Sequence, residues 1–93
     1  MRTIDRSTAF KRDYKREAKG PYRATLDQLL QPLLHALVSD ESLDIRYRDH
    51  ELSGTWAGYR ECHIKPDLLL IYRKADSVTL RLARLGSHGE LFD

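Results

Sequence analysis

The sequence predicts an α+β fold, in which an N-terminal strand and a helical hairpin pack on a mainly antiparallel, twisted sheet of four to five strands. The first half of the chain carries apolar residues at helical spacing, whereas the second half carries the apolar runs and alternations of strands. The turns between those strands are short, so the strands are expected to pair as antiparallel hairpins. A chain of 93 residues has the size of one domain, residues 1–93, around a single core.

The first predicted elements are a short strand at residues 2–6 and a helix after it. Ser7 has the chemistry of a helix N-cap. The apolar side chains of this helix recur at every fourth position, at Phe10, Tyr14 and Ala18. We expect Gly20 to end the helix in the left-handed conformation.

A second amphipathic helix is predicted between residues 22 and 38. Its apolar stripe comprises Tyr22, Leu26, Leu29, Leu30, Leu33, Leu34, Leu37 and Val38. Pro32 lies inside this stripe and lacks an amide hydrogen, so we expect a kink or two abutting helices there. The two predicted helices form a hairpin, whose joint apolar face needs a sheet to cover it.

Three strands are predicted in the second half, after an acidic loop at 39–49. They cover residues 58–65, residues 68–72 and the stretch from residue 78 onward. The middle strand is apolar throughout, as expected for a strand that is buried on both faces. If the last hairpin turns symmetrically about residues 75–76, Ile71 lies opposite Leu80 and Asp67 lies opposite Arg84.

The composition is that of a globular protein, with 32% charged and 41% apolar residues. No apolar run approaches the ~18–20 residues that cross a bilayer. The N-terminus also lacks an apolar leader segment, so we expect a cytoplasmic protein with no membrane partner. Cys62 is the single cysteine, which excludes an internal disulfide framework and a CxxC zinc pattern.

Positive charge is concentrated near the N-terminus, where residues 1–20 contain seven basic and three acidic side chains. We interpret the basic helix residues as candidate contacts to RNA or the ribosome, because such a helix can follow a phosphate backbone. These residues are Lys11, Arg12, Lys15 and Arg16. The charge pattern alone leaves open the alternative of a solvated helix face.

Side chains suited to phosphodiester chemistry gather between residues 47 and 67 and again at 84–88. Three of the four histidines lie there, at His50, His63 and His88. Histidine can take and give a proton near neutral pH, and arginine binds phosphate through two parallel hydrogen bonds. His35 lies instead on the second predicted helix, beside its apolar stripe, and we assign it no role.

The same two stretches resemble the RelE/ParE superfamily of bacterial toxins, and within it the YafQ branch. The resemblance rests on the strings DHxLxGxWxGYRxxHxxPDxxLIY at 49–72 and RxGxHxxLF at 84–92. These strings cover roughly the C-terminal half, and the N-terminal half is similar only in its pattern of a strand and two helices. Two positions depart from the branch: Glu61 stands where aspartate is frequent, and Leu68 stands where an aromatic residue can follow Pro-Asp.

The resemblance implies the toxin of a type II toxin–antitoxin pair, which is silenced by a cognate antitoxin protein. Such a toxin is a ribosome-dependent endoribonuclease that cuts messenger RNA in the ribosomal A site, beside ribosomal RNA, with no cofactor and no metal. We expect His50 to be the base, His88 the acid and Arg84 the phosphate ligand, with His63 and Asp67 orienting the others. Further RNA contacts are expected from Arg60, Glu61 and Phe92.

Other interpretations stay open. Some members of the superfamily bind DNA gyrase and cut nothing, and a plain RNA-binding module would also be basic, but neither needs several proton carriers. The three histidines and Asp67 could also bind zinc or iron. No HxH or HExxH spacing supports such a metal site, and two nearby arginines would repel a cation.

Overall fold

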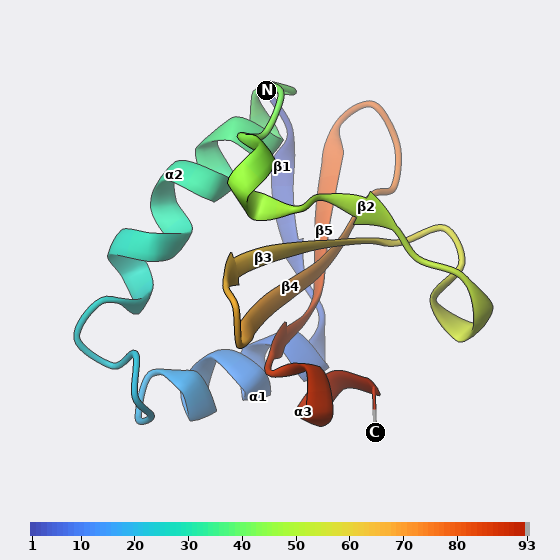
Figure 1. Ribbon diagram of the computed structural model, residues 1–93. Coiled ribbons are helices and arrows are strands. Elements are labelled where there is room, and N and C mark those ends of the chain that lie inside the picture. The colour runs from blue at the N-terminus through green and yellow to red at the C-terminus, as the bar shows by residue number, and fades with distance from the viewer. Residues whose placement is uncertain (93) are drawn as a thin grey trace.

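The computed structural model describes residues 1–92, which form a five-stranded sheet with helices (Figure 1). The elements are β1 (Thr3–Arg6), α1 (Thr8–Glu17), α2 (Leu26–Val38), the 3₁₀ turn η1 (Ile45–Tyr47), β2 (His50–Glu51), the 3₁₀ turn η2 (Gly54–Trp56), β3 (Arg60–Lys65), β4 (Leu68–Lys74), β5 (Thr79–Gly86) and α3 (His88–Phe92). The strand order is β1-β5-β4-β3-β2. Strand β1 runs parallel to β5 and the other neighbours are antiparallel, which confirms the predicted α+β class. Among the described residues, no helix is long and apolar enough to cross a membrane.

The sheet is buried on both faces because β4 carries apolar side chains on each of them. Leu68, Leu70 and Tyr72 belong to the larger core cluster, which α1 and α2 cover. Leu69 and Ile71 point the other way and pack with residues of α3 and of the loop before β3. All five are at most 2% exposed, which confirms the predicted doubly buried strand. The face of the sheet that carries Leu69 and Ile71 is called the distal face below.

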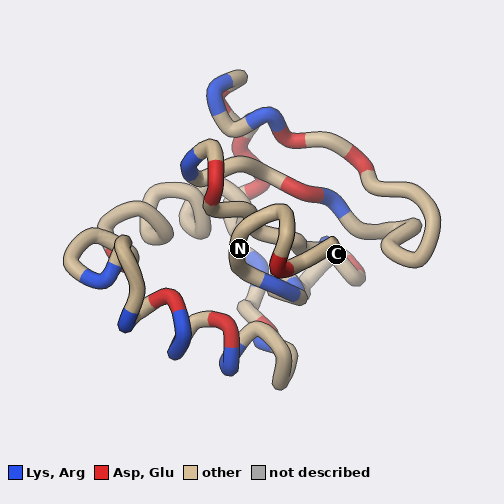
Figure 2. The backbone as a smooth tube through the Cα atoms, turned by 60° about the horizontal axis from the view of Figure 1, so that its bottom comes forward, with Lys and Arg blue, Asp and Glu red and all other residues tan. Residues whose placement is uncertain are grey.

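Helix α1 begins at Ser7, as predicted. The Ser7 Oγ accepts a hydrogen bond from the Phe10 amide (2.9 Å) and donates one to the Ala83 carbonyl of β5 (2.7 Å). Ser7 therefore caps the helix and also fixes its start to the sheet. Basic and acidic residues alternate along the helix (Figure 2), but the acidic ones, Asp13 and Glu17, are buried, so the charges on its exposed side are basic.

The end of α1 differs from the prediction, because Gly20 is not left-handed. Among residues 1–92, the glycines with positive φ are Gly54 and Gly58, which flank η2. The helix ends at Glu17 and the chain continues through successive turns, in which the Gly20 carbonyl accepts from the Arg23 amide (3.0 Å). Since these turns reverse the chain gradually, no residue there has to adopt the left-handed conformation.

Helix α2 runs from Leu26 to Val38 as one element with Pro32 inside it. The predicted alternative of two abutting helices is therefore wrong. Proline removes one hydrogen bond of the helix. The buried side chains on either side of it, Leu30 and Leu33, are at most 4% exposed, and their packing against the sheet holds the helix together across the proline.

The β4–β5 hairpin has a different register from the symmetric one. Leu80 pairs with Lys74, and Arg84 pairs with Ile71, with an irregularity between Ile71 and Tyr72. The predicted pairing of Asp67 with Arg84 is therefore wrong. The reason lies in the sequence of β5: Leu82 and Leu85 both face the larger core but are three residues apart. A strand can bury both on one face only if it contains an extra residue, which is the bulge.

A buried carboxylate, Asp13 of α1, joins α1 to β5. Its Oδ2 accepts hydrogen bonds from Arg84 Nε (2.7 Å) and from the Leu85 amide (3.0 Å), and its Oδ1 accepts one from Arg16 Nη1 (2.9 Å). Arg16 also lies 3.0 Å from Glu90 of α3 through its Nε. Asp13 is fully buried, so these bonds replace the water that its charge loses on folding.

Burial by itself raises the pKa of the Asp13 carboxyl, but hydrogen bonds from Arg84, the Leu85 amide and Arg16 outweigh burial and leave that pKa below its usual value. A lowered pKa means that the folded protein binds this proton less tightly than the unfolded chain does. The resulting stabilisation is present above the unfolded pKa of ~4 and is lost as the pH falls through the folded value.

We expect Asp13→Asn to lower the free energy of unfolding by about 1–3 kcal/mol at pH 7, because the arginines lose a charged acceptor in a buried place. The difference from the wild type should shrink below about pH 4. Urea denaturation across a pH series measures both effects. Asp5→Asn is the matched control, since the Asp5–Arg81 pair is exposed and should be worth about 0–1 kcal/mol. Equal effects of the two substitutions would contradict the importance of the buried carboxylate.

Candidate active site

Two predicted site histidines lie side by side on the distal face. His50 of β2 pairs with Glu61 of β3, and His63 follows two residues later on β3, so the three side chains point to one face. The imidazole centroids of His50 and His63 are 6.2 Å apart. The Glu61 Oε1 lies 3.0 Å from His63 Nε2 and 3.7 Å from His50 Nε2. One carboxylate therefore serves both imidazoles.

Glu61 is buried, although we expected it to be exposed and to contact RNA. Its side chain is 6% exposed, whereas that of His50 above it is 51% exposed. Glu61 pairs with Ile71 in the sheet, and the packing of the distal face covers it. Its position fits a group that holds histidines better than one that touches RNA.

The backbone determines which nitrogen of His50 can take up a proton. His50 Nδ1 lies 2.7 Å from the Arg48 carbonyl oxygen, which can only accept a hydrogen bond. Nδ1 therefore carries the hydrogen, and in the neutral ring Nε2 has a free lone pair. Arg48 has a positive φ of 49°, and this left-handed residue turns its carbonyl toward the histidine. The imidazole is thus held in the tautomer that can act as a base through Nε2.

Arg84 lies in the same row of paired residues as the histidine pair. Glu61 pairs with Ile71, and Ile71 pairs with Arg84, so about two strand spacings, or about 10 Å, separate the Glu61 and Arg84 backbones. Asp13 binds Arg84 through Nε and Nη2. The Nη1 group, with two hydrogens, stays available for an anion. The register therefore places the Arg84 backbone in the row of the histidine pair, while Asp13 of α1 fixes its guanidinium.

His88 is the first residue of α3, and Ser87 and Glu90 hold that helix in place. The Ser87 Oγ accepts a hydrogen bond from the Glu90 amide (3.2 Å), and the Glu90 side chain accepts one from the Ser87 amide (2.9 Å). This is a capping box. The His88 ring lies 4.9 Å from the Phe92 ring, and Phe92 packs on the apolar cluster of the distal face. Helix α3 therefore carries His88 to the face that bears His50 and His63.

Asp67, predicted to orient the other site residues, lies just before β4 and bonds elsewhere. The Tyr22 hydroxyl donates a hydrogen bond to it, and this bond raises the pKa of Tyr22 to about 12. Arg84, its expected partner, is bound by Asp13 instead.

Asp13 was missed in the sequence, although it lies three residues after Phe10 and shares the buried side of α1. A charged residue on the apolar stripe of a helix was the available signal.

The residues predicted to bind RNA fall into two groups. Arg60 donates bonds of 3.1 and 2.8 Å to Asp49, which raises the pKa of its guanidinium and makes it part of the scaffold. Arg16 is likewise engaged, by Asp13 and its neighbours. Within residues 1–92, three exposed cations of α1 have no carboxylate within 4.0 Å: Lys11, Arg12 and Lys15. In the same part of the chain, no group of three or more His, Cys, Asp or Glu side chains could hold a metal ion.

Comparison with known proteins places this geometry among bacterial toxins. Residues 2–93 match the family described as the bacterial toxin of a type II toxin–antitoxin system, YafQ. The mRNA interferase toxin YafQ of Escherichia coli K12 is 34% identical over 91 residues, which cover 96% of this chain and 98% of the relative. A putative toxin YafQ of Haemophilus influenzae is 33% identical over 90 residues, covering 94% of this chain and 88% of the relative.

Solved structures agree with the sequence comparison. A metal-bound toxin from Helicobacter pylori has a TM-score of 0.87 and 43% identity, covering 99% of this chain and 100% of its own. The toxin in the DinJ–YafQ complex of Escherichia coli has a TM-score of 0.85 and 36% identity, with both chains covered completely. Both likenesses extend over nearly the whole chain, so they include the distal face and α3.

Proposed function

The chain belongs to the YafQ family of toxins of type II toxin–antitoxin systems, and from this membership and the distal-face geometry we propose that it is a ribosome-dependent endoribonuclease that cuts messenger RNA in the ribosomal A site. Its relatives in Escherichia coli are named mRNA interferases, which supports RNA cleavage as the activity. The observation that carries the proposal is the pair His50 and His63 on one carboxylate, in the row that also holds Arg84.

The proposed reaction starts at the ribose. His50 takes the proton of the 2′-hydroxyl at its free Nε2, and the 2′-oxygen attacks the adjacent phosphorus. The bond from phosphorus to the 5′-oxygen then breaks, and His88 donates a proton to that leaving oxygen. The products are a 2′,3′-cyclic phosphate and a free 5′-hydroxyl. Water enters the site only in later hydrolysis of the cyclic product.

Arg84 is proposed to bind the scissile phosphate through Nη1 and to stabilise the charge that builds up on phosphorus. Because Asp13 holds the other side of the guanidinium, this group needs little reorganisation when the charge develops. Glu61 and His63 are proposed to keep the His50 ring in place and to stabilise it once it carries a proton. Asp67 would act at a distance, by fixing Tyr22.

Phe92 is proposed to contribute a stacking surface for a base, a contact that is worth about 1–3 kcal/mol where it occurs. Its ring already packs against His88, so base stacking would also restrict the orientation of that imidazole.

Lys11, Arg12 and Lys15 are proposed to contact ribosomal or messenger RNA, because they are exposed and have no carboxylate partner in the described chain. Arg16 and Arg60 are proposed to support the site from within the protein.

Replacing the proposed base or acid should abolish cleavage without unfolding the protein. We expect His50→Gln and His88→Ala to slow mRNA cleavage on programmed ribosomes by roughly 10²–10⁴-fold each. Their unfolding free energies should stay within about 0.5 kcal/mol of the wild type, since both rings are exposed. Mapping the mRNA ends and urea denaturation provide the two measurements. His35→Gln is the control, with an exposed ring on α2, and should cleave normally.

Cleavage should continue after all metal has been removed. In the proposed mechanism His50 and His88 carry the protons and Arg84 the charge, so we expect dialysis against EDTA to change the rate less than about twofold, well below the effect of a catalytic group. Since a related toxin is described as metal-bound, the assay should include re-addition of zinc and copper. A loss of activity that either metal restores would overturn the metal-independent mechanism.

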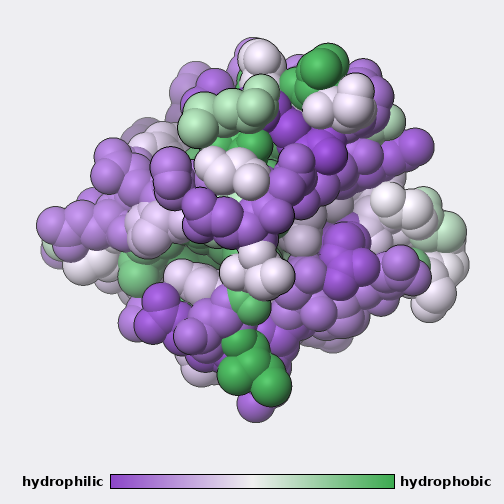
Figure 3. Space-filling model, turned by 90° about the horizontal axis from the view of Figure 1, so that it is seen from above, coloured by the Kyte–Doolittle hydropathy of each residue, from purple (hydrophilic) through white to green (hydrophobic). Residues whose placement is uncertain are grey.

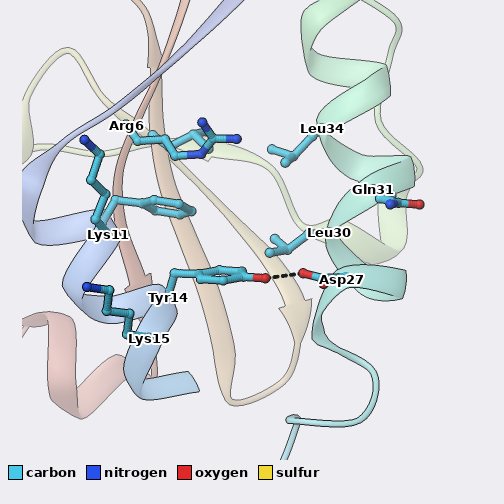
Figure 4. A pocket seen from close by; sticks show the side chains of 10 residues that line it. Arg6, Lys11, Tyr14, Lys15, Asp27, Leu30, Gln31 and Leu34 are labelled. Atoms are coloured by element: carbon cyan, nitrogen blue, oxygen red, sulfur yellow. Dashed lines mark hydrogen bonds between the residues drawn. The ribbon is translucent and has the colours of Figure 1, made fainter. Parts of the chain in front are cut away.

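We propose that the cognate antitoxin binds in a groove between α1 and α2, with a volume of about 510 Å³. The floor of the groove is apolar, with Phe10, Leu30, Leu34 and Leu82. Its rim carries Arg6, Lys11 and Lys15, and the Tyr14 hydroxyl donates to Asp27 across one end (Figure 4). An apolar floor with a cationic rim fits an amphipathic segment with acidic residues, which would fold on binding. The DinJ–YafQ complex supports an antitoxin as the partner.

Reversing two rim charges tests the groove. We expect the double variant Lys11→Glu and Lys15→Glu to slow antitoxin association and to flatten its dependence on salt, because opposite charges accelerate capture. Stopped-flow association across a salt series measures both. The control is Lys19→Glu with Arg23→Glu, which changes the net charge equally outside the groove. Identical rates for the two double variants would mean that the groove is not the antitoxin site.

A further inference from the structure

A second hollow, beside the histidine pair, has no part in the mechanism above. It has a volume of about 300 Å³, and its lining residues come from η1 and from the end of β3. They are Arg46, Arg48, His63, Ile64, Lys65 and Pro66. His63 therefore belongs both to this hollow and to the candidate active site.

Three cations line the hollow, and none of them forms an ion pair with a carboxylate of residues 1–92. Within residues 1–92, Arg46, Arg48 and Lys65 have no acidic group within 4.0 Å, and all three are exposed. Arg60 of β3 and Arg84 of β5 differ, since both are bound by carboxylates. Three cations around one hollow repel one another, and a bound anion would relieve that repulsion.

The local structure orders the backbone segments that carry these cations. Asp44 caps η1 by accepting from the Arg46 amide (2.9 Å), and the Arg46 guanidinium lies 4.9 Å above the Tyr47 ring. The bulge of β3 between His63 and Lys65 ends the regular pairing, and β2 pairs only with the first two residues of β3. The rest of that edge borders η1, so Lys65 lines the same hollow as Arg46 of η1 and Arg48, the residue that follows η1.

We propose that this hollow binds a phosphate of the RNA next to the scissile one, and so fixes the position of the substrate strand along the histidine pair. The inference rests on the proposed function, because it assumes an RNA strand at His50 and His63. Arginine suits the role since its guanidinium can form two parallel bonds to a phosphate. The face of the molecule seen in Figure 3 is largely hydrophilic, with scattered apolar patches. Ile45 of η1, beside Arg46, is an exposed apolar side chain, so the surface around the hollow combines cations with some apolar area.

Removing the charge of the cations and removing the charge of the phosphate should weaken RNA binding to the same extent. The variant combines Arg46→Gln with Lys65→Gln and leaves Arg48 intact, because its carbonyl positions His50. The probe is a messenger RNA that carries a 2′-deoxy nucleotide at the cleavage position, bound to programmed ribosomes. In a second set of RNAs, a methylphosphonate replaces one flanking phosphate at a time. The control variant is Lys19→Gln with Arg23→Gln, which removes equal charge elsewhere.

We expect one methylphosphonate position to weaken wild-type binding about tenfold, as for the loss of a charge-assisted contact. The Arg46 and Lys65 variant should bind the unmodified RNA about tenfold more weakly and should ignore that methylphosphonate, whereas the control variant should respond like the wild type. For the Arg46 and Lys65 variant, the slope of log affinity against log salt should be smaller in magnitude by about 0.7. With cleavable RNA the variant should raise KM and keep kcat.

Equal losses in wild type and variant at every methylphosphonate position would overturn the inference. So would a variant that binds unmodified RNA as tightly as the wild type. Failure of the proposed function looks different, because the wild-type protein would then leave the cleavable messenger RNA intact on the ribosome. If the wild type cleaves the RNA but the substitutions in the hollow do not change RNA binding, only the phosphate-binding inference is contradicted. The proposed catalytic function is then unaffected.

Discussion

The buried carboxylate of Asp13 is the interaction on which the other parts of the structure depend. A charge with no water around it has to be surrounded by donors, and those donors come from two elements: Arg16 of α1, and Arg84 and the Leu85 amide of β5. Arg16 also pairs with Glu90, which connects α3 to the same cluster. Each of these elements carries part of the candidate site. The same bonds that satisfy the charge therefore set the distance between Arg84, the proposed phosphate ligand, and the helix that carries His88.

The bulge in β5 shows how core packing and site geometry are coupled. The bulge exists because Leu82 and Leu85 must both enter the larger core from one strand. A consequence is that Arg84 pairs with Ile71 and lies in the row of Glu61 and His50. The position of Arg84 in the proposed catalytic site thus depends on the odd spacing of two leucines. Substitutions that remove the bulge should disturb this site without replacing any of its residues.

The sequence was sufficient for the elements that are long and periodic. The helix capped by Ser7, the apolar β4 and the alternating β5 all follow from local pattern, and the motifs located the histidines. Register was not predictable from turn symmetry, since the bulge depends on which face the whole core occupies. The burial of Glu61 and the pairing of Asp13 with Arg84 were missed for a related reason: both are contacts between distant segments, and local spacing carries no information on them.

The parallel pairing of β1 with β5 has a consequence for the synthesis of the chain. Thr3 lies beside Thr79, and the Ser7 amide bonds to the Leu82 carbonyl, so the first strand has no partner until the last quarter of the chain has left the ribosome. The Asp13–Arg84 pair waits for the same segment. Contacts between such distant residues form late and slowly. The fold, and with it the candidate site on the sheet, is therefore completed only after β5 has been synthesised.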